Sequence, residues 1–158
     1  MVSYWKTVIQ KFTDLYTSPI STAPKKGSIN DRRVILDLSW PLTNSVNDSI
    51  DKNFYLGEYV HLTYPSIDEF SKIIANLGPG CLLFKRDLSR AYRQIPVCPG
   101  DVGFLGYSWK EKFFFDCTLP FGLRSAVFIC QRVTNAIAFM YRQIGYQIIN
   151  YIDDFGGA

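Results

Sequence analysis

Three aspartates have the residue type and position that most clearly predict chemistry. Asp153 and Asp154 are adjacent and directly follow an apolar segment, residues 146–152, and Asp87 lies near the end of a second such segment, residues 82–88. Crowded carboxylates repel each other unless a cation neutralises them. If the two segments pair in a sheet, three carboxylates converge, which suits Mg²⁺ ions held together with phosphate oxygens. Two such ions, about 3.5–4 Å apart, would activate an attacking hydroxyl and stabilise the leaving oxygen of an in-line phosphoryl displacement.

Each aspartate also has an ordinary explanation when it is considered alone. An aspartate at a strand end is commonly a cap or a surface charge, and two adjacent aspartates commonly form a turn. The arrangement of all three is therefore more informative than any one of them.

Local patterns predict the elements that would position these residues. We expect a helix over residues 1–16, a hairpin or flexible fingertip within residues 18–31 that leads into a strand over 33–38, and a loop over 39–64. The spacing of Ser66 and Glu69 is that of a capping box, and the apolar positions that follow predict a helix that ends before Gly78.

The second half of the chain predicts further strands and one long helix. Residues 82–88 alternate as a strand does, and residues 103–117 predict a hairpin that turns at Lys110 and Glu111. Apolar residues spaced by three or four predict a helix from Ala126 to Ile144, and residues 146–152 predict a final strand. This order favours an α+β fold in which helices cover one face of an antiparallel sheet.

Composition narrows the class of protein. Of 158 residues, 47% are apolar and 20% are charged, and no apolar run is long enough to span a membrane. The N-terminus lacks the apolar core of a secretory signal, so we expect an intracellular protein, cytoplasmic or nuclear. The four cysteines form no C-x-x-C pair and the single histidine has no second histidine nearby, so neither predicts a zinc site. The net charge of +3 is too small to establish nucleic-acid binding by itself.

Three segments, in order, resemble the palm motifs of reverse transcriptases. They are KRDLSRAYRQIPV at residues 85–97, LPFGLRSA at 119–126 and YIDD at 151–154. Upstream, PKK at 24–26 and RRVILDL at 32–38 resemble the fingers of the same family, so the resemblance covers most of the chain. The sequence LPFGL at residues 119–123 is more similar to the corresponding motif of retrotransposon enzymes than to that of lentiviral enzymes. The resemblance implies a right-hand polymerase with fingers in residues 1–80 and a partial palm in residues 81–158.

The resemblance also implies a role for individual residues. Asp87, Asp153 and Asp154 match the catalytic carboxylates that bind two magnesium ions, for which manganese can substitute. Residues that match the family's nucleotide-binding positions are Lys26, Arg33, Leu88, Tyr92, Phe121 and Gly122. Tyr92 would lie beneath the sugar and exclude a 2′-hydroxyl by a clash. Lys26 and Arg33 would grip the triphosphate, with Lys25 and Arg32 as alternatives.

The roles of a few further residues in the matched segments remain open. Arg124, Gln131 and Arg132 would meet template or nucleotide, although an ordinary solvent-facing role explains them equally well. The family commonly has proline where this chain has Val127, which bears on helix entry more than on chemistry.

The activity implied is templated addition of deoxynucleotides to a primer 3′-hydroxyl, with an RNA or DNA template. Because the chain stops shortly after Asp154, we expect the rest of the palm, the thumb and RNase H to be absent and the isolated chain to be inactive without them or a partner subunit. The alternative is an inactive retroelement remnant that at most binds nucleic acid. An RNA-dependent RNA polymerase is disfavoured by Tyr92.

Overall fold

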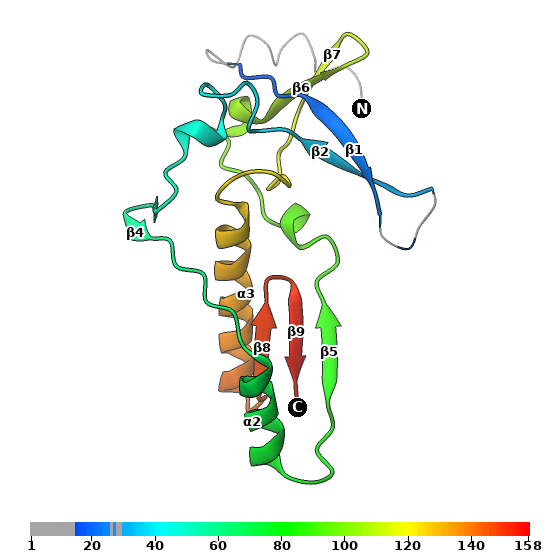
Figure 1. Ribbon diagram of the computed structural model, residues 1–158, viewed down its shortest axis with the longest axis vertical. Helices are drawn as coiled ribbons and strands as arrows, with labels where there is room; N and C mark the ends of the chain where they lie inside the picture. The colour runs from blue at the N-terminus through cyan, green and yellow to red at the C-terminus, as the bar shows by residue number, and fades with distance from the viewer. Residues whose placement is uncertain (1–14, 26, 28–29) are drawn as a thin grey trace. The chain divides into compact units, whose positions relative to one another are not determined.

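The computed structural model describes residues 15–25, 27 and 30–158 (Figure 1). The chain divides into two compact units, each built from two stretches of sequence: Met1–Asp51 with Tyr92–Ala126, and Lys52–Ala91 with Val127–Ala158. We call them the first and the second unit. The boundary expected after residue 80, between fingers and palm, stays a prediction. Within the described residues, no helix has both the length and the apolar character needed to cross a bilayer.

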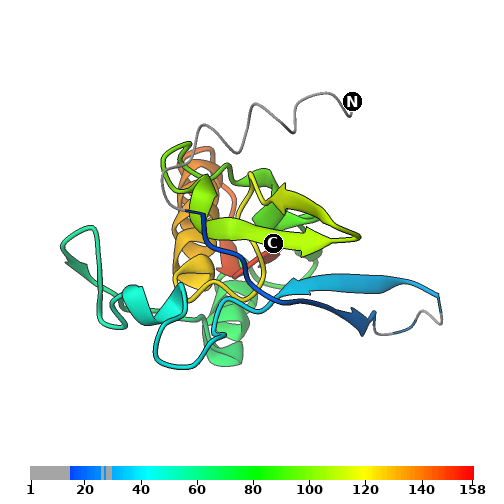
Figure 2. The same ribbon diagram turned by 90° about the horizontal axis from the view of Figure 1, so that it is seen from above.

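Two antiparallel ribbons form the first unit. Strands β1 (Ile20–Pro24) and β2 (Arg32–Leu36) pair with Pro24 opposite Arg32, and β6 (Gly106–Trp109) pairs with β7 (Lys112–Phe115). Figure 2 shows both ribbons projecting to the same side of this unit. The predicted turn at Lys110 and Glu111 is confirmed, and both residues have the positive φ, 48° and 60°, that a tight two-residue hairpin requires.

The base of these ribbons is the core of the first unit. Leu36, Leu38 and Leu105 are buried together, with Leu123 packed against them. The helix predicted over residues 1–16 falls outside the described residues as far as residue 14, and Leu15 and Tyr16 are not helical.

A three-stranded antiparallel sheet forms the centre of the second unit, in the order β5 (Phe84–Asp87), β9 (Asp154–Gly157), β8 (Ile148–Tyr151) (Figure 1). A small hairpin of β3 (Phe54–Tyr55) and β4 (Glu58–Tyr59) precedes it in sequence. Sequence patterns predicted β5 and β8 but not β9, which is the middle strand. The strand that carries Asp87 therefore pairs with β9, and β8 lies at an edge.

Both predicted helices of the second unit are present. Helix α2 (Ile67–Leu77) begins with the expected capping box, in which Ser66 Oγ accepts the Glu69 N–H and Glu69 accepts the Ser66 N–H. Helix α3 (Ala126–Gln143) supplies Ala138 to a cluster with Ile148 and Phe155.

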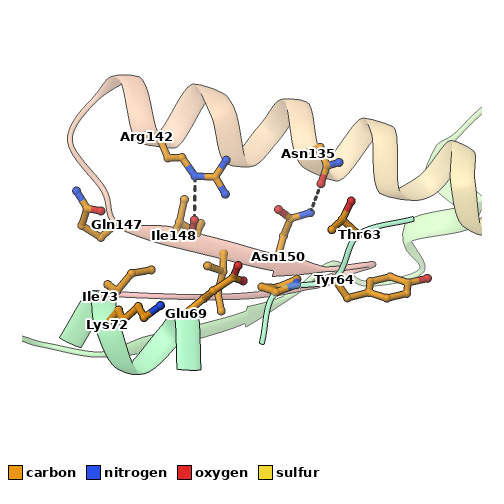
Figure 3. Close-up of a pocket in the computed structure, with 12 residues that line it drawn as sticks. Thr63, Tyr64, Glu69, Lys72, Ile73, Asn135, Arg142, Gln147, Ile148 and Asn150 are labelled. Carbon is orange, nitrogen blue, oxygen red and sulfur yellow. Dashed lines mark hydrogen bonds between the residues drawn. The ribbon is translucent and has the colours of Figure 1, made fainter. Parts of the chain in front are cut away.

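The two helices lie on opposite faces of the sheet, so the expectation that helices cover only one face is wrong (Figure 3). Phe155 points toward Ala138 of α3, whereas a Cβ on the neighbouring Gly156 would lie 3.8 Å from the Phe70 ring of α2. Successive residues of a strand face opposite sides, so these contacts place α2 and α3 on different faces. The mixed α and β class with antiparallel sheets is confirmed.

Candidate active site

Asp87 and Asp154 lie directly opposite each other at one end of the β5–β9 pair. Cross-strand partners point to the same face, with Cβ atoms about 4.5–5.5 Å apart, so two like charges are adjacent there. Lys85, two residues before Asp87 and hence on the same face, places its Nζ 3.1 Å from Asp154 Oδ1. The structure thus supplies a positive side chain beside the paired carboxylates, which sequence analysis did not anticipate.

Asp153 lies in the two-residue turn between β8 and β9. Ile152, which precedes it, has φ of 53°, an unusual conformation for a β-branched residue. Two hydrogen bonds hold the turn: Ile152 N–H donates to Gln131 Oε1 at 2.8 Å, and Leu88 N–H donates to the Asp153 carbonyl at 2.9 Å. Strained backbone persists where its surroundings fix it, and such turns are frequent at functional sites.

Sequence analysis missed the role of Gln131, whose buried side-chain amide holds the turn between β8 and β9. Only 3% of Gln131 is exposed, so it does not lie on the solvent face of α3. Its Nε2 donates to Asn135 Oδ1, which also accepts from Asn150 Nδ2 of β8. This network connects α3 to the strand and to the turn that carries Asp153.

The second unit does not gather all three carboxylates into a metal-binding set. Across the described residues, no group of three or more acidic, histidine or cysteine side chains lies in an arrangement that holds a metal ion. Asp87, Asp153 and Asp154 offer the oxygen donors that Mg²⁺ prefers and all lie at the same end of the sheet. The magnesium site therefore stays a prediction.

Cys130 of α3 lies close enough to the turn to be affected by its charge. Burial raises the pKa of the Cys130 thiol, and the negative charge of Asp153 raises it further. Only 1% of Cys130 is exposed. The thiol is thus held neutral beneath the carboxylate.

In the first unit, the rings of Tyr92 and Phe121 pack against each other. Their centroids are 4.8 Å apart at an interplanar angle of 43°. Tyr92 is 7% exposed, whereas Phe121 is 39% exposed. The pair therefore consists of one buried ring and one partly exposed ring.

Gly122 follows Phe121 in a conformation that favours glycine. Its φ is 99°, and a Cβ at this position would lie 2.7 Å from the Leu36 carbonyl oxygen. Its own carbonyl accepts a hydrogen bond of 2.8 Å from Asn47 Nδ2. The backbone here approaches β2 so closely that no other residue type fits without displacement.

The two adjacent arginines of β2, Arg32 and Arg33, differ in their side-chain contacts. Arg32 donates to Thr22 Oγ1 at 2.7 Å and to the Thr22 carbonyl at 3.3 Å. Arg33 is exposed on β2, opposite Ala23, and its side chain forms no hydrogen bond or ion pair with another of the described residues. Lys26 lies outside the described residues. Of the two arginines, Arg33 is thus the one whose guanidinium remains available.

Three other candidates have intramolecular partners. The Leu88 side chain packs against the buried cluster of the second unit rather than lying on its surface. Arg124 donates to the Ile50 carbonyl at 2.8 Å, and Arg132 donates to Glu58 Oε2 at 2.6 Å. Each of these side chains therefore has a structural role within its own unit.

Comparisons with known proteins point to one group. No protein-family model matches the chain. The chain is 28% identical over 150 residues to the retrovirus-related Pol polyprotein from transposon opus, and 28% identical over 151 residues to that from transposon gypsy, both of Drosophila melanogaster. Each match covers 93% of this chain, and the chain spans 13% of the length of each polyprotein.

Solved structures agree in fold. The foamy viral protease–reverse transcriptase dRH in complex with double-stranded DNA matches 99% of this chain and 26% of its own, with a TM-score of 0.67 and 18% identity. A second foamy viral protease–reverse transcriptase, also in complex with double-stranded DNA, matches 100% of this chain and 32% of its own, with a TM-score of 0.66 and 17% identity. The resemblance is confirmed: over 93% of its length this chain is similar to retrotransposon Pol polyproteins, and its fold is similar to part of the foamy viral protease–reverse transcriptase.

Proposed function

We propose that this chain is part of a reverse transcriptase domain that adds deoxynucleotides to the 3′-hydroxyl of a primer on an RNA or DNA template. The observation that supports this most directly is the pairing of Asp87 with Asp154 beside the Asp153 turn, at one end of a three-stranded sheet. We assign that sheet to the palm and the β1–β2 ribbon to the fingers.

The aspartates would hold two Mg²⁺ ions, with Mn²⁺ as a substitute. The bound ions would activate the primer hydroxyl and stabilise the leaving oxygen of the nucleotide. The protein's own contribution is to fix the carboxylates: Gln131 and the Leu88 N–H hold the Asp153 turn, and β5–β9 pairing holds Asp87 opposite Asp154. Such preorganisation lowers the cost of placing charge when the substrate binds.

The first unit would bind the nucleotide. Tyr92, supported by Phe121, would lie beneath the sugar and leave no room for a 2′-hydroxyl. Arg33, together with Lys26, would neutralise the triphosphate, since a guanidinium binds phosphate oxygens through two parallel hydrogen bonds.

Nucleotide binding to the 158-residue chain tests this proposal. Titration calorimetry with dCTP and CTP in the presence of Mg²⁺ should give tighter binding for dCTP, and Tyr92→Val should bring the two dissociation constants together. Tyr107→Val is the matched control, because Tyr107 also stacks on a phenylalanine of the first unit, Phe114, with centroids 5.4 Å apart. It should leave the ratio unchanged.

Two results would contradict the proposal. Equal affinity for dCTP and CTP in the unmodified chain would remove the role of Tyr92. Binding of a primer–template duplex with no measurable nucleotide binding would favour the remnant that only binds nucleic acid.

A further inference from the structure

The side chain of Asn47 connects segments that are far apart in the sequence. It is 4% exposed, and its Nδ2 donates to Ser39 Oγ at 2.9 Å and to the Gly122 carbonyl at 2.8 Å. Its Oδ1 accepts the Arg124 N–H at 2.7 Å. The orientation of the amide is set by its partners, because a backbone carbonyl only accepts and a backbone N–H only donates. Asn47 thus uses both ends of its amide.

Asn47 is itself held in place by the turn around it. Its N–H donates to the Leu38 carbonyl at 2.9 Å. On either side of it, Ser45 and Asp48 exchange hydrogen bonds: Ser45 Oγ donates to Asp48 Oδ2 at 2.7 Å, and the Asp48 N–H donates to Ser45 Oγ at 3.2 Å. A buried amide on such a fixed backbone has little freedom to follow the loop that it binds.

The loop that Asn47 binds is the one that carries Phe121 and Gly122. Gly122 is held from one side by close approach to the Leu36 carbonyl and from the other by Asn47. Arg124 adds a second connection to the same region through its bond to the Ile50 carbonyl. Because Phe121 directly precedes Gly122, fixing the Gly122 backbone also restricts where the Phe121 ring lies against Tyr92.

We propose that Asn47 is a positioning residue for the nucleotide site: it fixes the Gly122 backbone, and through it the Phe121–Tyr92 pair, and so sets the discrimination between deoxyribonucleotides and ribonucleotides. The inference rests on the proposed function. A merely structural Asn47 would affect stability but would leave the ratio of the two affinities unchanged.

Two substitutions separate the bonds that Asn47 makes. Asn47→Asp keeps an acceptor for the Arg124 N–H but loses both donors, so that the Gly122 carbonyl faces a carboxylate oxygen. Asn47→Ala loses all three bonds. Asn44→Asp, three residues away and exposed, is the matched control for the added charge. Circular dichroism establishes that each variant is folded before it is compared.

The first measurement is amide hydrogen exchange by NMR, which needs no nucleotide. Exchange at the Arg124 amide should rise roughly fivefold to tenfold in Asn47→Ala and stay near the unmodified rate in Asn47→Asp and Asn44→Asp. An unchanged rate in folded Asn47→Ala would overturn the positioning role.

The second measurement is calorimetry with dCTP and CTP. Both Asn47 variants should reduce the ratio of the CTP to the dCTP dissociation constant by roughly threefold or more, whereas Asn44→Asp should not. If the unmodified chain discriminates and folded Asn47→Asp discriminates equally well, this inference fails and the proposed function stands. If the unmodified chain binds neither nucleotide, the proposed function fails and the inference fails with it.

Discussion

Replacing Gly122 by alanine should destabilise the first unit. At φ of 99° an L-residue is strained, and the left-handed region costs a non-glycine residue roughly 1–2 kcal/mol. The new Cβ would also lie 2.7 Å from the Leu36 carbonyl oxygen, so either β2 or the loop must move, and overpacking of this kind typically costs about 1–3 kcal/mol. The total of about 2–5 kcal/mol should lower the midpoint of thermal unfolding by at least about 5 °C.

Tryptophan fluorescence isolates the response of that unit. All three tryptophans of the chain, Trp5, Trp40 and Trp109, fall within the sequence ranges of the first unit, and none falls within those of the second. Gly122→Ala should therefore shift the fluorescence transition in a thermal or urea titration.

Gly100→Ala is the control for this experiment. A Cβ at Gly100 meets nothing within 4 Å and its φ is not in the positive range, so stability should stay the same or rise slightly. Coincident fluorescence transitions for Gly122→Ala and the unmodified chain would refute the close approach to Leu36.

Three other substitutions or reactions test separate parts of the structure. Lys85→Met should tighten Mn²⁺ binding to the chain about twofold to fivefold, measured by electron paramagnetic resonance, because it removes a competing cation 3.1 Å from Asp154. Lys112→Met is the control, and an unchanged Mn²⁺ affinity in Lys85→Met would contradict the competition. Hydrogen bonds from Ser45 lower the pKa of Asp48, so Ser45→Ala should lower the thermal midpoint at pH 7, and the difference should shrink as the pH falls through that lowered pKa. The part that remains at low pH reflects the lost bond from the Asp48 N–H to Ser45 Oγ, and a pH-independent difference would refute the linkage. Because burial raises the pKa of Cys130, a thiol reagent at pH 8 should label the exposed Cys98 and Cys117 first, as read by peptide mass spectrometry. Rapid labelling of Cys130 in the native chain would be inconsistent with its burial.

Elements that are determined by residues close together in the sequence were predictable. The capping box of Ser66 and Glu69 defines the start of α2 because its two hydrogen bonds span only three residues. The Lys110–Glu111 turn was predictable because both flanking arms alternate and are aromatic.

Strand β9 and the order of the sheet were not predictable in the same way. Its sequence, Asp154-Phe155-Gly156-Gly157, is short and half glycine, and glycine is depleted in strands. The strand forms because β5 and β8 pair with it on both sides, and Phe155 is buried under α3. Pairing between distant segments leaves no periodic signal in a four-residue strand.

The candidate site was partly predictable. Motif spacing placed Asp87, Asp153 and Asp154 at one end of a sheet, as the structure has them. Lys85 was read only as part of a motif, since nothing local indicates that its side chain reaches Asp154 on the neighbouring strand. Asn47 was assigned to a loop and its role was missed, because two of its three side-chain partners are 75 and 77 positions away in the sequence.

The interleaving of the two units has a consequence for the order in which the chain folds. Each unit consists of two stretches of sequence, and strands β5 and β9 of the second unit are separated by the whole of Tyr92–Ala126, which belongs to the first. During synthesis, β5 would leave the ribosome well before β9, the strand it pairs with, and would have to wait with neither edge paired. Contacts between such distant residues slow folding, since the entropy of closing the intervening loop must be overcome first. The early-formed hairpins, β8–β9 among them, and α2 would then be the nuclei, and pairing of β9 with β5 would be the late step that places Asp154 opposite Asp87.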